Sequence, residues 1–179
     1  VKFSLISHKP IMGYREFIVN DSNYISLDNK GDIAADMTLL SGEKQISFKT
    51  KNDSTNNILL LKLQQLDIAS ILKLWPLSPK VEGTLSANLG VNLSAKRFGA
   101  RGSVTIDSLI YEDKRVGDLN LKAGYRMLQE EGQEVMVSLN LDKKDVAKLS
   151  GKYLPGSDVP MKLKLNIDSL PFSSINVSL

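Results

Sequence analysis

Residues 81–95, with the sequence VEGTLSANLGVNLSA, alternate between apolar and polar positions without a break. Apolar residues or glycine occupy every odd position, and polar residues or glycine occupy every even one. Because successive side chains of a β-strand point to opposite faces, this pattern predicts a strand with one apolar and one polar face. A two-residue hairpin inside the segment would reverse the odd/even phase, and the phase does not reverse. An unbroken strand of this length spans about 50 Å, which favours a long ribbon over a compact sandwich.

The same one-sided alternation recurs downstream, in residues 119–127, 135–141 and 161–167, with turns expected at 130–132 and 155–156. Met136 is the one apolar residue out of phase in these runs. Turns of hairpin length force neighbouring strands to run antiparallel, so we expect an antiparallel meander. The glycines in Gly42-Glu43-Lys44 and in residues 99–103 are interpreted as hairpin turns.

The first third of the chain has shorter strand-like runs, at 1–6, 16–19, 24–27, 33–39 and 46–48. Turn-forming residues separate these runs. The almost wholly polar segment 51–57 is the best candidate for a mobile loop. The chain is therefore expected to be mainly β from its first residues onward.

One segment breaks the β pattern and predicts a short helix. Asp67 can cap a helix over residues 68–75, and Pro76 ends it. The apolar residues of this helix follow the i, i+3, i+4, i+7 spacing; they are Ile68, Ile71, Leu72 and Trp75. The helix either covers the end of the sheet or acts as a plug at the mouth of an apolar space. A similar strand-to-helix sequence starts at Asp168, which suggests an internal repeat.

The apolar positions of the long strands are expected to share one face and to line a common apolar channel. They are Leu85, Ala87, Leu89, Val91, Leu93, Leu119, Leu121, Tyr125, Val135, Val137, Leu139, Leu163, Leu165 and Ile167. Such a face either closes into a core or stays open as a groove, and an open apolar groove requires a ligand. Acyl chains suit it because burying each methylene contributes about 0.8 kcal/mol without a directional partner.

Composition excludes several function classes. The 179 residues predict a single β-rich domain, with residues 1–57 and 58–179 as its two candidate sub-units. The chain has no cysteine and a single histidine, His8, so no nucleophile, acid–base pair, metal site or cofactor site is expected. With a net charge of +3 and 6% aromatic residues, no nucleic-acid interface is expected either. The lysines at 143, 144, 148, 152, 162 and 164 are interpreted as a solvated strand face.

Four short phrases resemble the repeat of the TamB family, the translocation and assembly module proteins related to AsmA. In order along the chain they are Leu66-Asp67-Ile68, Gly83-Thr84-Leu85, Leu109-Ile110-Tyr111 and Gly117-Asp118-Leu119. The opening, with residues 23–27 and 31–33, is similar to Bacteroidetes versions of that family. The chain starts and ends inside alternating segments, so we expect it to be a piece of a longer member.

The resemblance implies a β-taco, in which a long, strongly curved antiparallel sheet has an apolar concave face. It also implies a periplasmic protein, anchored in the inner membrane by a segment absent from this sequence. Such proteins work with an Omp85-type outer-membrane partner, in phospholipid transport or in outer-membrane protein assembly. The alternative is a β-sandwich binding or adhesion module with a closed core. A porin fragment is a third class, and both of these predict aromatic clusters that the sequence lacks.

Overall fold

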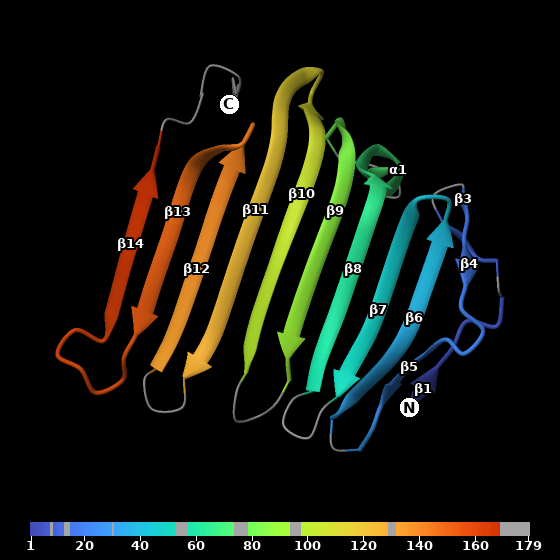
Figure 1. The fold of residues 1–179 in the computed structure, drawn as a ribbon, viewed down its shortest axis with the longest axis horizontal. Coiled ribbons are helices and arrows are strands. Elements are labelled where there is room, and N and C mark those ends of the chain that lie inside the picture. The colour runs from blue at the N-terminus through green and yellow to red at the C-terminus, as the bar shows by residue number, and fades with distance from the viewer. Residues whose placement is uncertain are drawn as a thin grey trace.

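The protein is mainly β, with one long antiparallel sheet and one short helix (Figure 1). The structure, a computed structural model, describes residues 1–7, 9–12, 15–29, 31–52, 57–73, 79–93, 98–128 and 132–168, without the side chains of residues 52 and 128. In Figure 1 the long strands lie side by side in one broad layer, with β14 at one edge and β1 at the other.

The sheet contains twelve strands, and eleven of them follow the order β1-β5-β6-β7-β8-β9-β10-β11-β12-β13-β14, while β4 pairs with β6. The early strands are β1 (Lys2–Phe3), β4 (Ile18–Val19), β5 (Tyr24–Leu27), β6 (Ile33–Ser41), β7 (Lys44–Asn52) and β8 (Asn57–Asp67). The later strands are β9 (Val81–Asn92), β10 (Gly99–Tyr111), β11 (Lys114–Leu128), β12 (Gly132–Leu141), β13 (Lys144–Tyr153) and β14 (Met161–Ile167). The helix α1 spans Ile68–Leu72, and β2 (Ile11–Met12) pairs separately with β3 (Arg15–Glu16).

The predicted meander is confirmed, since every described strand pair is antiparallel and consecutive long strands are neighbours. The alternating segment at 81–95 forms β9 over its first twelve residues with no internal hairpin. Two-residue turns join several of these strands, at Glu112-Asp113 and at Asp142-Lys143, and both residues of each turn have positive φ. Such turns match the right-handed twist of the strands they connect.

The hairpin turn expected at Gly42-Glu43 is confirmed, whereas the one expected at residues 99–103 is wrong. That segment is the start of β10 and pairs with both β9 and β11. Its glycines serve a close approach of neighbouring strands. A Cβ on Gly102 would lie 3.0 Å from the Asn88 carbonyl oxygen and 3.1 Å from Leu89 Cδ1.

The short helix begins where the sequence predicts. The Asp67 side chain accepts a hydrogen bond from the Ser70 amide at 3.2 Å, which satisfies one of the unpaired donors of the first helical turn. Trp75 and Pro76, the tip of the polar segment at 53–56, the turn residues 129–131 and the second strand-to-helix sequence after Asp168 lie outside the described residues. Lys51 and Asn57, which flank that tip, belong to β7 and β8.

The sheet is not strongly curled, which corrects the curvature that a β-taco implies (Figure 1). Curling needs bulges or kinks repeated across the body of a sheet. Here the bulges fall near the α1 end of the strands, between Leu63 and Leu66 in β8, between Ile106 and Leu109 in β10, and at Val146 in β13. The ladders that run from these bulges to the other end of the strands are regular, so nothing in the pairing there curls the sheet strongly.

In the part of the chain that the structure describes, the sheet is a single layer over most of its width. The chain exposes 12783 Å² to solvent, about 1.5 times the roughly 8,600 Å² expected for a compact protein of this mass. Among the described residues, few apolar side chains are fully buried. A buried cluster of Phe17, Val19 and Leu39, with Met37 and Ile46 packed against it, lies near the N-terminal edge.

Candidate functional site

The strand register gathers the predicted groove residues on one face of the sheet. Directly paired residues point to the same side of a sheet, so a chain of pairs across the strands defines a row. One row runs Leu61, Leu89, Gly102, Ala123, Val137, Leu149 and Leu165. The rows beside it are Leu59, Val91, Ala100, Tyr125, Val135, Gly151 and Leu163, then Leu63, Ala87, Val104, Leu121, Leu139, Ala147 and Ile167, then Leu66, Leu85, Ile106, Leu119 and Leu141. We call this surface the apolar face.

All the predicted groove residues on described strands fall in these rows, and Leu93 follows directly after β9. None of them is fully buried. Leu89, in the middle of the sheet, is 41% exposed, and Leu165 on β14 is 60% exposed. Glycine at position 151 leaves room for the side chains of Val135 and Leu163, which a Cβ there would meet at 3.0 and 2.5 Å. The result is a nearly continuous aliphatic surface.

At its N-terminal end the apolar face is covered. Leu39 pairs with Ile46, and Ile46 pairs with Leu63, so the buried cluster continues the same rows. Phe17 and Val19, from the preceding segment, pack in this cluster and are 4% and 2% exposed, and Val19 of β4 pairs directly with Leu39. This segment therefore borders β6 within the sheet and contributes Phe17 and Val19 to the buried cluster.

Two asparagines fix the covering segment to the edge of the sheet. The Asn20 amide oxygen accepts from the Thr38 amide at 2.8 Å, and its nitrogen donates to the Asp36 carbonyl at 3.3 Å. Asn23, 5% exposed, binds both the amide and the carbonyl of Leu5. Buried amide side chains with satisfied partners hold a segment in one position, because breaking them would leave unpaired polar groups.

The helix α1 lies at the end of the sheet, against β8 and β9 (Figure 1). Ile68 is 9% exposed, and Ile71 and Leu72 are half-buried. Trp75 lies outside the described residues. This position covers the strand ends beside Leu66 and Leu85, which pair across β8 and β9. Its role as a plug stays a prediction.

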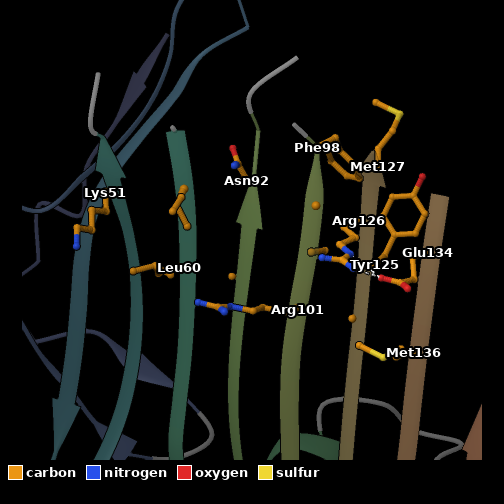
Figure 2. A pocket seen from close by; sticks show the side chains of 15 residues that line it. Lys51, Leu60, Asn92, Phe98, Arg101, Tyr125, Arg126, Met127, Glu134 and Met136 are labelled. Atoms are coloured by element: carbon orange, nitrogen blue, oxygen red, sulfur yellow. Dashed lines mark hydrogen bonds and ion pairs between the residues drawn. The ribbon is translucent and has the colours of Figure 1, made fainter. Parts of the chain in front are cut away.

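A hollow of 880 Å³ lies at the other end of the strands, and most of its lining belongs to the opposite face. Its centre is a row of directly paired residues from five successive strands: Leu60, Gly90, Arg101, Gly124 and Met136. Figure 2 shows Arg101 extending from β10 across β9 toward β8. A Cβ on Gly124 would have no atom within 4 Å, so this glycine leaves open space over β11, on the side of β10 away from the Arg101 side chain.

The hollow is electropositive. Lys51, Arg101 and Arg126 line it, with Glu134 as the one carboxylate. Arg126 Nη2 lies 2.5 Å from Glu134 Oε2 (Figure 2), and Lys152 Nζ lies 3.4 Å from Glu134 Oε1. The hydrogen bond from Arg126 and the charges of both cations lower the pKa of Glu134 despite partial desolvation. The structure gives Arg101 no ion pair within the described residues.

The hollow contains residues that the sequence analysis did not select. Tyr125 is the one predicted groove residue that lines it, and its ring lies 5.9 Å from that of Phe98 at the end of the hollow (Figure 2). Met136 is out of phase with the other apolar residues of its strand. It points away from the apolar face, and 58% of its surface is exposed. Leu60 and Ile58 carry the same signal, as even-numbered apolar residues of a strand whose odd positions 59, 61 and 63 are also apolar.

Neither a metal-binding group of three His, Cys, Asp or Glu residues nor a helix able to cross a membrane occurs in the part of the chain that the structure describes. Comparison of the chain with protein-family models, with curated proteins and with solved structures found no match. The fold and its two surfaces therefore carry the functional argument: an open, single-layer antiparallel sheet with an aliphatic face.

Proposed function

We propose that this chain is a non-enzymatic acyl-chain-binding segment of a cell-envelope protein. The observation that carries the proposal is the apolar face, which spans β8 to β14 with no second layer over it among the described residues. An exposed apolar surface of this extent marks a binding surface or an aggregation liability. Acyl chains fit an aliphatic sheet because their burial gains free energy without polar partners.

Within this class, we propose a TamB-related protein that moves phospholipid between the inner and outer membranes. In this role the apolar face shields the acyl chains while the headgroup stays in water. The proposal places the protein in the periplasm and includes a membrane anchor and an Omp85-type partner that binds regions outside these residues. The exposed fractions of Leu89 and Leu165 support it over a sandwich with a closed core.

The test uses two neighbouring residues of β9 that point to opposite faces. Leu89→Asp introduces a charge on the apolar face, and Asn88→Asp introduces the same charge on the other face. Both positions are exposed, so both variants should fold, with melting temperatures within a few degrees of the parent.

Native mass spectrometry of each purified protein then measures co-purified phospholipid. Leu89→Asp should retain several-fold less lipid than the parent, while Asn88→Asp should retain the same amount. If Leu89→Asp unfolds the protein, the face is a sealed core, because an unpaired buried charge costs several kcal/mol. Equal lipid retention in both variants would also contradict the proposal.

A further inference from the structure

The hollow on the opposite face combines a cationic centre with apolar walls. Leu60 and Ile58 of β8 form one wall, and Met136 of β12 forms the other. Between them the floor is strand backbone at Gly90, Gly99 and Gly124. Its volume of 880 Å³ falls within the range of small-molecule sites.

Among the described residues, Glu134 in the hollow has ion-pair partners, whereas Arg101 has none. Glu134 is bound by Arg126 and Lys152 together, so its negative charge is already compensated. Arg101 lies in the central row, beside two glycines, and no carboxylate of the described residues pairs with it. A planar guanidinium with free donors suits a carboxylate or phosphate group, which it can bind through two hydrogen bonds.

We propose that this hollow binds a single anionic amphiphile, with its carboxylate or phosphate head on Arg101 and its apolar chain along Leu60 and Met136. This site is separate from the apolar face of the proposed function and lies on the other side of the same sheet. Charge complementarity selects an anion, and the aliphatic walls over a glycine floor select an attached hydrocarbon chain.

Methionine methyl groups provide one reporter for each face. Met136 lines the hollow, and Met161, at the start of β14, lies on the apolar face, with 58% and 59% of their surfaces exposed. In the protein labelled with ¹³C at its methionine methyls, decyl phosphate below its micelle-forming concentration should shift the Met136 resonance saturably. Inorganic phosphate and the neutral decyl maltoside should bind at least about tenfold more weakly than decyl phosphate. Inorganic phosphate lacks the hydrocarbon chain, and decyl maltoside lacks the negative charge.

Three variants test whether decyl phosphate binds in the hollow itself or is only attracted by the positive charge of this face. Arg101→Gln should raise the Kd for decyl phosphate about tenfold. Gly124→Leu should abolish the Met136 shift, since its side chain enters the hollow without a clash at Cβ. Lys122→Gln, which removes a cation from the same face outside the hollow, should change the Kd less than about twofold.

Three outcomes would overturn the proposal. They are a shift confined to Met161, equal weakening by Arg101→Gln and Lys122→Gln, and binding of inorganic phosphate as tight as that of decyl phosphate. The first of these would place the amphiphile on the apolar face, as the proposed function expects. Loss of lipid binding at Met161 with an intact response at Met136 would instead contradict the proposed function and leave this site supported.

Discussion

Leu39 and Leu165 lie on the same face of the same sheet, yet Leu39 is 5% exposed and Leu165 is 60% exposed. At Leu39 the segment before β5 adds Phe17 and Val19 to a small buried cluster, and β4, which contains Val19, pairs with β6 beside Leu39. At Leu165 the structure places no second layer in the described residues. The same alternating sequence therefore supports two different roles, a packed core at one edge and a solvent-facing surface at the other.

This difference indicates that the two regions are stabilised by different interactions. Near β6, burial of apolar side chains and the hydrogen bonds of Asn20 and Asn23 stabilise the fold. Near β14, the apolar side chains lose much less contact with water, and the ladders of backbone hydrogen bonds between β11, β12, β13 and β14 hold the structure. A substitution that removes apolar contacts should therefore lower the free energy of unfolding more near β6 than near β14.

The largest expected effect comes from the same substitution made in both regions. Leu39→Ala should reduce the free energy of unfolding by about 2–5 kcal/mol, because it leaves a cavity in a packed cluster. Leu165→Ala, at an exposed site, should reduce it by less than about 1 kcal/mol. Chemical denaturation measures both values. Equal losses at the two positions would show that Leu39 and Leu165 contribute equally to the stability of the sheet.

A second prediction concerns backbone geometry in the open region. Gly132 has a φ of 89°, and a Cβ there would lie 1.7 Å from the Tyr153 carbonyl oxygen. Gly132→Ala should therefore destabilise the protein by about 2 kcal/mol or more, through the left-handed backbone and the clash with β13. Gly124→Ala, where a Cβ meets no atom, is the control and should cost less than about 1 kcal/mol. Similar stabilities for the two variants would mean that the ladder between β12 and β13 contributes little.

The smallest expected effect is a pH dependence from Glu134. Arg126 and Lys152 lower its pKa in the folded protein, so the stabilisation is fully present above the unfolded value of about 4.3 and is lost as the pH falls through the lower folded value. The parent should therefore lose slightly more thermal stability than Glu134→Gln between about pH 5 and pH 3. Thermal melts at several pH values measure this difference, and parallel curves would show that the contact does not stabilise the sheet.

Local sequence patterns predicted β9, β11, β12 and β14 because each of these strands has one apolar and one polar face. Asp67 likewise predicted the start of α1, since helix capping depends on neighbouring residues alone. The segment from Gly99 was misinterpreted because glycine also occurs in strands that approach each other closely. A sheet that is not strongly curled could not be distinguished from a curled one, since the alternation of apolar and polar residues is the same in both.

The hollow could not be predicted from local sequence patterns, for a different reason. Its central row takes one residue from each of five strands, and only the register brings Leu60, Arg101 and Met136 together. Out-of-phase apolar residues at two of these positions were visible in the sequence, but their alignment was not. The covering of Leu39 also depends on long-range contacts, through Asn20 and Asn23.

Single thiols can show whether the apolar face is open and binds acyl chains. The chain has no cysteine, so Leu121→Cys and Lys122→Cys each carry one reporter, on neighbouring residues of β11 that point to opposite faces. After labelling with an environment-sensitive fluorophore, each protein is mixed with vesicles of phosphatidylethanolamine and phosphatidylglycerol. We predict that both thiols react without lipid and that only the probe at position 121 shifts its emission to the blue with vesicles. An unreactive thiol at 121, or equal emission shifts at both positions, would contradict the account.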